Sequence, residues 1–317
     1  MNKLSKKAFE EIRLWVYRNA RHLELALWKY HFENGSKEDV IVALSFYQNK
    51  DGGFGNGLEP DSWNPNSSPY TTLYAIGILN EINAIDTNQS MVQEILKYFD
   101  SGVNSDESGW YFNIPSNDLH AHAPWWTYDK KANEYESLGV TAGIVEFILR
   151  YASKDSRLYM RALSLAEKLI QKLEVQGNFG EMGVQGYCKL KDMIMLLDRT
   201  DQYDMNVINH TVCELVNTSI ERDSSKWCYH CKTPRDFITS PNSEFYKDNV
   251  EITEAELDYI IVTRPEQGVW GINWSWFDNN DKYPKEFAIS ENWWKSCKAI
   301  STLLHLRDFQ RIELQDI

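Results

Sequence analysis

The fold of this chain is decided in the stretch Tyr47-Gln48-Asn49-Lys50-Asp51-Gly52-Gly53-Phe54-Gly55-Asn56-Gly57-Leu58-Glu59-Pro60-Asp61. It ends an apolar helical run, turns on a cluster of glycines, and then delivers two carboxylates before the next helical pattern. Glycine reaches positive φ without strain and lets the backbone pass close to its neighbours. We therefore expect a tight turn between two helices, with a candidate site beside it.

Helical periodicity dominates the rest of the chain, and strand patterns are weak. Before the turn, the pattern predicts a helix that begins near Ser5, a second over roughly residues 20–32, and a third after Ser36. After the turn, residues 69–79 are apolar almost all round, which is typical of a helix enclosed by other helices. The sequence therefore predicts an all-α fold.

The order of helix, aromatic-anchored turn and apolar helix recurs downstream, which indicates an internal repeat. The anchoring aromatics follow one another at intervals of roughly 45 to 70 residues, the length of a helix hairpin with insertions. They are Phe54, Trp110, Phe179, Trp227 and Trp270. The rhythm predicts about five to six helix hairpins, closed into a ring that forms a single domain over residues 1–317.

Composition narrows the classes of partner. The formal net charge is −13, which argues against nucleic acid or anionic lipid as the main partner, since both bind basic patches. The five cysteines are scattered and odd in number, which suggests reduced thiols in a cytoplasmic setting. No signal-peptide core and no membrane-spanning window stand out. We expect a soluble, cytoplasmic protein with a small-molecule substrate and no stable membrane insertion; the oligomeric state is unknown.

The string Gln48-Asn49-x-Asp51-Gly52-Gly53-Phe54-Gly55-x-x-Leu58-Glu59-Pro60-Asp61, followed by a helix that opens near Tyr70-Thr71, resembles a known turn. The turn that it resembles is that of the terpenoid cyclase and protein prenyltransferase repeat, also called the squalene cyclase repeat. The string is similar as well to uncharacterised bacterial proteins described as prenyltransferase-like. The resemblance implies an α/α toroid, in which outer helices end in the glycine-aromatic turn and inner helices line a central cavity.

The resemblance does not carry over a catalytic motif. The Asp-x-Asp-Asp motif of class II terpene cyclases is absent from the sequence. The nearest string to the magnesium-binding Asp-Asp-x-x-Asp motif is Asp278-Asn279-Asn280-Asp281, where a solvated turn is the other reading. The helix openings at residues 69–74 and 186–189 lack the Asp, Cys and His set with which protein prenyltransferases hold zinc. We predict no cofactor, with Mg or Zn as the alternatives.

Long loops after the turns carry the residues of the predicted site, because such loops in a compact domain are usually functional. In a toroid these loops gather at one end. The residues predicted to act as acids and bases are Asp61, Asp118, His120 and His122. The residues predicted to bind substrate are Glu59, Trp63, Trp110, Trp125, Trp126, Trp270, Trp274, Trp276 and Asp278. For the two histidines, hydrogen bonding to the loop backbone is the alternative.

A zinc site is a further alternative. His210-x-x-Cys213 and Cys228-x-x-Cys231 are separated by 14 residues, which resembles the spacing of a zinc ribbon. His210 and Cys213 fall in a helical pattern, however, where Cys213 would be an ordinary small core residue.

Two chemistries suit an aromatic, acidic cavity. Aromatic faces stabilise cationic intermediates and solvate isoprenoid chains, so we expect an enzyme that acts on an isoprenoid-like or polycyclic small molecule. Aromatic faces also stack on sugars, and Glu59 or Asp61 opposite Asp118 or Asp278 would form the carboxylate pair of a glycosidase. A carbohydrate-active hydrolase or lyase on an α/α toroid is therefore the alternative. A non-catalytic binding protein that uses the same cavity is the second alternative.

Overall fold

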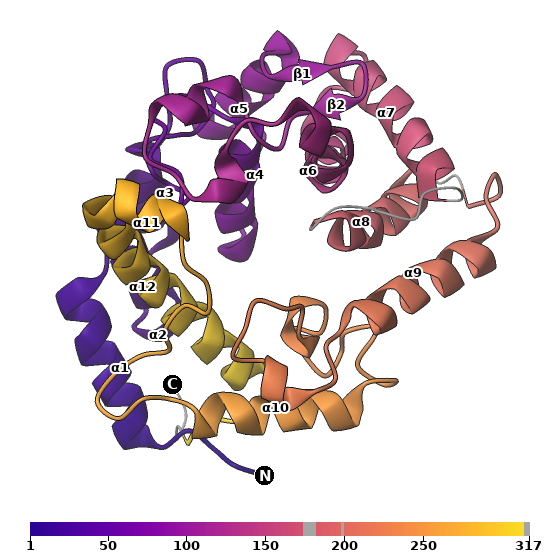
Figure 1. The fold of residues 1–317 in the computed structure, drawn as a ribbon. Helices are drawn as coiled ribbons and strands as arrows, with labels where there is room; N and C mark the ends of the chain where they lie inside the picture. Colours follow the sequence, from indigo (N-terminus) through magenta and orange to yellow (C-terminus); the bar gives the residue numbers. More distant parts are fainter. Residues whose placement is uncertain (174–181, 198–199, 314–317) are drawn as a thin grey trace. The chain divides into compact units, whose positions relative to one another are not determined.

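The computed structural model describes residues 1–173, 182–197 and 200–313 (Figure 1). Within these residues the chain forms twelve α-helices, four short 3₁₀-helices and one hairpin of two-residue strands. The all-α prediction is thereby confirmed. In the same part of the chain, no helix combines the length and the apolar character that a bilayer span requires.

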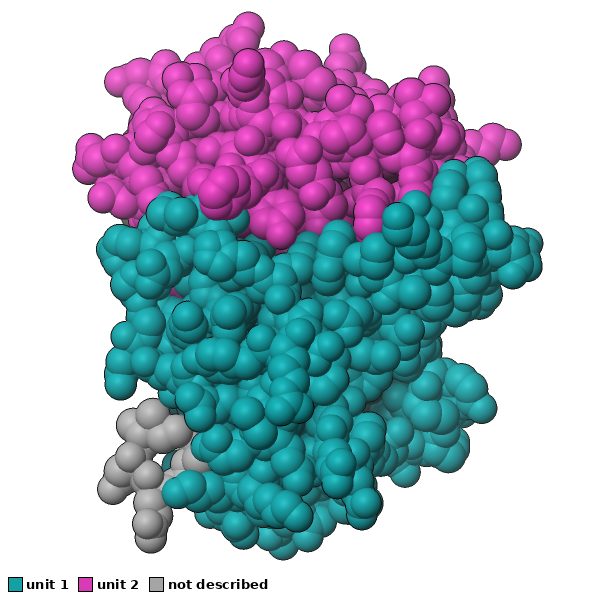
Figure 2. All heavy atoms as spheres, turned by 90° about the vertical axis from the view of Figure 1, so that its left-hand side faces the viewer, with its two compact units in different colours: residues 1–43, 216–317 teal, residues 44–215 magenta. Residues whose placement is uncertain are grey.

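Residue contacts divide the chain into two compact units, which Figure 2 shows in different colours. Unit 1 comprises residues 1–43 and 216–317, and unit 2 comprises residues 44–215. The two boundaries fall within helices α3 (Lys37–Ser45) and α9 (Met205–Ser219). A single toroid domain over residues 1–317 stays a prediction.

Unit 1 is built around a long C-terminal helix that packs on the first two helices of the chain. The C-terminal helix is α12 (Pro284–Asp308), and the first two are α1 (Lys6–Asn19) and α2 (His22–Phe32). The other helices of the unit are α10 (Val250–Val262), α11 (Asp278–Lys282), η3 (Ser224–Lys226) and η4 (Pro234–Asp236). The Ser5 hydroxyl accepts the N–H of Ala8, so the first helix begins where the sequence predicts. The ring of Phe9 on this helix contacts the rings of Trp28 and Phe32 on α2.

Unit 2 centres on a buried 22-residue helix, α6 (Lys130–Tyr151), which contacts α4, α7 and α8. Its other elements are α4 (Pro69–Glu81), α5 (Ser90–Ser101), β1 (Ser105–Asp106), β2 (Gly109–Trp110), η1 (Pro115–Leu119), η2 (Pro124–Trp126), α7 (Arg157–Leu173) and α8 (Gly183–Leu196). A Cβ on Gly186 would lie 2.9 Å from the Cα of Gly139, so α6 and α8 approach each other closely through glycine.

The turn quoted at the outset is held by its glycines and by a buried threonine. Gly52 has a φ of +89°, and a Cβ there would lie 2.1 Å from the carbonyl oxygen of Glu94. Phe54 is fully buried, and its N–H donates to Oγ1 of Thr72 at 3.0 Å. The turn therefore binds its aromatic residue directly to the helix that follows.

A second turn repeats this arrangement. Gly109 has a φ of +133°, Trp110 is fully buried, and the Trp110 N–H donates to Oγ1 of Thr141 at 3.0 Å. Trp227 and Trp270 are anchored differently, because each donates its indole N–H to a backbone carbonyl at 2.8 Å. The turn predicted around Phe179 lies outside the described residues.

Loss of the threonine acceptor is expected to destabilise the fold. In Thr141→Val the Trp110 N–H stays buried without its acceptor, which we expect to lower the free energy of unfolding by about 1–3 kcal/mol. Thr141→Ser keeps the hydroxyl and should retain more of the stability. Urea unfolding measures both variants, with Thr263→Val at an exposed helix end as the control. Equal values for the valine and serine variants would show that the hydroxyl contributes nothing.

Candidate functional site

The two predicted site loops of unit 2, residues 58–68 and 111–129, lie against each other. Ser62 and His122 form an antiparallel bridge. The N–H of Trp63 donates to the carbonyl of Ala121 at 2.9 Å, and the N–H of Ala123 donates to the carbonyl of Asp61 at 2.9 Å. The structure thus brings the backbones of Asp61 and His122 together.

Buried asparagines fasten these loops. The Nδ2 of Asn64 donates to Oδ1 of Asn117 at 2.8 Å, and the Nδ2 of Asn117 donates to the carbonyl of Trp126 at 2.9 Å. The Oδ1 of Asn133 accepts the N–H groups of Phe112 and Asn113. Because each buried amide is satisfied, this network fixes the loop conformation.

His122 takes part in the same local structure. It is 4% exposed, with Nδ1 2.7 Å from the carbonyl oxygen of His120 and Nε2 3.1 Å from Oγ1 of Thr127. A carbonyl oxygen only accepts, so Nδ1 carries a proton and donates it to the carbonyl of His120. This geometry matches the alternative of a histidine that hydrogen-bonds to the loop backbone.

The other predicted residues of unit 2 differ widely in exposure. Asp118 is exposed, and its Oδ1 accepts the N–H of Tyr128 at 2.9 Å. Glu59 and Asp61 are each 2% exposed. His120, Trp63 and Trp125 are half-buried, and Trp110 and Trp126 belong to the core. A cavity of about 460 Å³ in unit 2 is lined by other residues.

Unit 1 contains a cavity of about 450 Å³ with an aromatic wall. Two predicted residues, Trp270 and Trp274, line it together with Trp227 and Tyr259. The rings of Trp227 and Tyr259 meet edge to face at 5.3 Å. The remaining predicted residues of this unit lie elsewhere: Trp276 is fully buried against Phe287, and Asp278 is exposed at the start of α11.

An acid in this cavity was not among the sequence predictions. Glu256 of α10 is 2% exposed, and its Oε2 accepts the backbone N–H of Arg235 at 2.9 Å. Burial raises the pKa of Glu256 to about 7, and the nearby charge of Asp236 adds to the rise. The carboxyl is therefore poised between its neutral and ionised forms near neutral pH.

Two cations, Arg235 and Lys298, line the same cavity as this acid. The guanidinium of Arg235 donates to Oγ1 of Thr302 at 3.1 Å and to Oγ of Ser301 at 3.3 Å. The ammonium of Lys298 lies 5.3 Å from the ring centroid of Trp274. Burial, and next the charge of Arg235, lower the pKa of Lys298 to about 8. The same two causes lower the pKa of His305 to about 3, so that imidazole is neutral.

A signal in the sequence could have identified Glu256. The buried positions of α10 are Thr253, Glu256, Leu257 and Ile260, which recur at helical spacing. A glutamate within an otherwise uncharged stripe is a candidate for a shifted pKa, because burial disfavours its charged form. Lys298 gives no comparable signal, since its neighbours on α12 mix polar and apolar residues.

The residues of the zinc alternative are divided between the units. His210 lies on α9 with its side chain 73% exposed, where its Nε2 is 3.5 Å from Glu214. Cys228 and Cys231 line the unit 1 cavity, and their thiols donate to the carbonyls of Ser225 and Lys226. Over the described ranges, no three metal-binding side chains form a group suited to a metal ion.

Comparisons of the chain with protein-family models, with curated proteins and with solved structures give no match. The resemblance of the turn at residues 47–61 therefore remains an expectation from its motif.

Proposed function

We propose that the protein is an enzyme that acts on an isoprenoid-like small molecule with an anionic headgroup, and that the unit 1 cavity is its active site. One observation carries the proposal. Two cations, Arg235 and Lys298, share the wall of an aromatic cavity with the buried acid Glu256. The cations would bind the headgroup, the aromatic wall would take the apolar chain, and the acid would move a proton.

The cations support an anionic headgroup because burial, and next the charge of Arg235, disfavour the charged form of Lys298. The charge of Arg235 contributes to the lowered pKa of Lys298, so the ammonium loses its proton more readily than an ordinary lysine. A phosphate or diphosphate bound between them would offset this repulsion and would accept charge-assisted hydrogen bonds from both. Arginine and lysine are the residues expected at such a site.

Glu256 supports a role in proton transfer. A carboxyl with a pKa of about 7 keeps its proton in much of the neutral range, as a general acid requires. Protonation of an alkene or of a leaving oxygen places positive charge on the substrate, and the faces of Trp270 and Trp274 would stabilise that charge. In this scheme Glu256 donates the proton and the tryptophans stabilise the cation that forms.

The proposal extends to the architecture and the cellular setting. We infer an α/α toroid of about five to six helix hairpins, since two turns share a glycine, a buried aromatic and a threonine acceptor. We also infer a cytoplasmic location, on the scattered and odd number of cysteines. Asp61, Asp118, His120 and His122 stay candidate acid–base residues of a separate loop site.

A thermal-shift screen tests the proposal. Geranyl and farnesyl diphosphate, with and without Mg²⁺, are compared with neutral malto- and xylo-oligosaccharides. A diphosphate that binds the folded state should raise the melting temperature in proportion to its saturation. Lys298→Met should reduce that shift, whereas Lys295→Met on the same helix, which removes a cation paired with Glu291, should not. Equal shifts in both variants would exclude Lys298 from the site.

A carbohydrate-active enzyme is the second candidate. The observation that favours it is that Asp236 and Glu256 both line the cavity, since glycosidases use paired carboxylates. Each of these carboxylates accepts one backbone N–H, Asp236 that of Thr233 at 2.8 Å and Glu256 that of Arg235 at 2.9 Å. A thermal shift with an oligosaccharide and none with a diphosphate would replace the first candidate by this one. Binding without turnover would support the ligand-binding alternative.

A further inference from the structure

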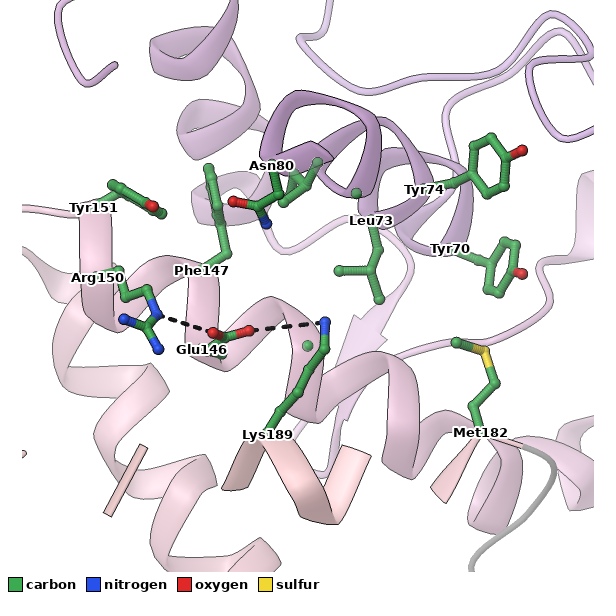
Figure 3. Close-up of a pocket in the computed structure, with 13 residues that line it drawn as sticks. Tyr70, Leu73, Tyr74, Asn80, Glu146, Phe147, Arg150, Tyr151, Met182 and Lys189 are labelled. Carbon is green, nitrogen blue, oxygen red and sulfur yellow. Dashed lines mark hydrogen bonds and ion pairs between the residues drawn. The ribbon is translucent and has the colours of Figure 1, made fainter. Parts of the chain in front are cut away.

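Unit 2 contains a cavity of its own, of about 460 Å³, bounded by α4, α6 and α8. Figure 3 shows Tyr70, Leu73 and Tyr74 of α4 on one side, with Phe147 on α6. Such a volume is within the usual range for small-molecule sites. The lining therefore combines aromatic and aliphatic side chains with polar and charged ones.

Three charged side chains, Glu146, Arg150 and Lys189, line this cavity. The carboxylate of Glu146 accepts from Nε of Arg150 at 2.9 Å and lies 3.8 Å from Nζ of Lys189 (Figure 3). Lys189 is too far away for a hydrogen bond in this pair, and Arg150 makes its contact without its two Nη groups. Two cations and one carboxylate leave the lining with a net positive charge, in a chain whose formal net charge is −13.

At Gly77 the lining of the cavity carries no side chain. A Cβ placed on Gly77, inside α4, would meet no atom within 4 Å. Packing therefore does not require glycine at this position, and glycine within a helix is less stable than alanine by about 1 kcal/mol. The absent side chain instead leaves space open along the cavity.

We propose that this cavity is a second ligand site, distinct from the unit 1 cavity, and that it binds an apolar carboxylic acid. The carboxylate would bind Arg150 and Lys189, which Glu146 neutralises only in part. The apolar body would lie against Phe147 and the tyrosines, over the open backbone of Gly77. The single excess positive charge favours a monoanion, whereas an amine would meet two cations.

Calorimetric titration with three matched probes tests the chemistry of this site. The probes are 4-phenylbutanoate, its neutral amide, and 4-phenylbutyl phosphate. Charge-assisted hydrogen bonds are the stronger ones, so the carboxylate should bind at least about tenfold more tightly than the amide. It should also bind more tightly than the phosphate dianion. Equal binding of acid and amide, or no binding of the acid at millimolar concentration, would overturn the proposal.

Paired variants locate the site. Gly77→Leu places a side chain in open space and should weaken binding of 4-phenylbutanoate at least about tenfold, while circular dichroism shows an intact helix. Gly271→Leu places a leucine side chain in the unit 1 cavity, where a Cβ also meets no atom within 4 Å. It should leave the binding of 4-phenylbutanoate unchanged. The binding of prenyl diphosphates should be weakened by Gly271→Leu and left unchanged by Gly77→Leu. The failure of one site is thereby distinguished from the failure of the other.

A charge variant completes the test. Lys189→Met should weaken the binding of 4-phenylbutanoate at least about tenfold and leave binding of the amide unchanged. Lys154→Met removes the same charge from an exposed loop of unit 2 and should change neither. Equal effects of the two substitutions would mean that the acid responds only to the net charge of the protein, which would overturn the proposed site.

Discussion

Glu256→Gln is expected to stabilise the protein at pH 8 by on the order of 3 kcal/mol and to leave its stability unchanged below pH 4.5. The folded protein raises the pKa of this carboxyl from 4.5 to about 7. Stability associated with the neutral acid is therefore fully present below pH 4.5 and is lost as the pH rises through 7. Glutamine resembles the neutral acid at every pH, so the variant keeps that stability.

Urea unfolding of the wild type and the variant at several pH values between 4.5 and 8 measures this difference. Glu266→Gln, in an exposed loop of the same unit, removes the same charge without burial and serves as the control. If Glu256 is the general acid, the stabilised variant should also lose turnover. Parallel pH profiles for the wild type and Glu256→Gln would contradict the shifted pKa.

Gly109→Ala is expected to destabilise unit 2 by at least about 3 kcal/mol, because backbone strain and steric overlap add together. The φ of Gly109 is +133°, and the new Cβ would lie 2.2 Å from Oγ1 of Thr141. That contact would also disrupt the hydrogen bond from the Trp110 N–H. Gly52→Ala should act similarly, since its Cβ would lie 2.1 Å from a backbone oxygen.

Alanine substitutions at two other glycines distinguish the cost of backbone strain from the cost of steric overlap. Gly102 has a φ of +71°, but its Cβ would come no closer than 3.7 Å to another atom, so Gly102→Ala should cost only about 1 kcal/mol. Gly77→Ala should instead stabilise the protein by about 1 kcal/mol. Thermal or urea unfolding ranks the four variants. Equal effects of Gly109→Ala and Gly102→Ala would rule out the close contact with Thr141.

The elements of the fold follow from local sequence to a large extent. Ser5 satisfies the first N–H groups of α1, and the apolar run at residues 69–79 lies within α4. The turn at Gly52 was predicted because glycine adopts positive φ without strain, whatever its neighbours are. These features depend on short-range chemistry, which the sequence displays directly.

The candidate site follows from the sequence much less. The aromatic wall at Trp270 and Trp274 was predicted, but Glu256, Arg235 and Lys298 were not. Their chemistry arises from burial and from charges on separate elements, η4, α10 and α12, which only tertiary packing brings together. For His122 the sequence offered two readings, and its hydrogen bonds to the carbonyl of His120 and the hydroxyl of Thr127, both in the same loop, match the reading of a histidine bound to the loop backbone.

The central claim is that an anionic substrate binds beside Lys298, and calorimetry in buffers of different ionisation enthalpy tests it most directly. The pKa of Lys298 is lowered to about 8, so a bound anion should restore its proton. Titration of geranyl diphosphate at pH 8 should therefore show proton uptake in the wild type and in Lys295→Met. That uptake should fall in Lys298→Met, with binding at least about tenfold weaker. No binding by the wild type, or identical proton uptake in all three proteins, would contradict the account.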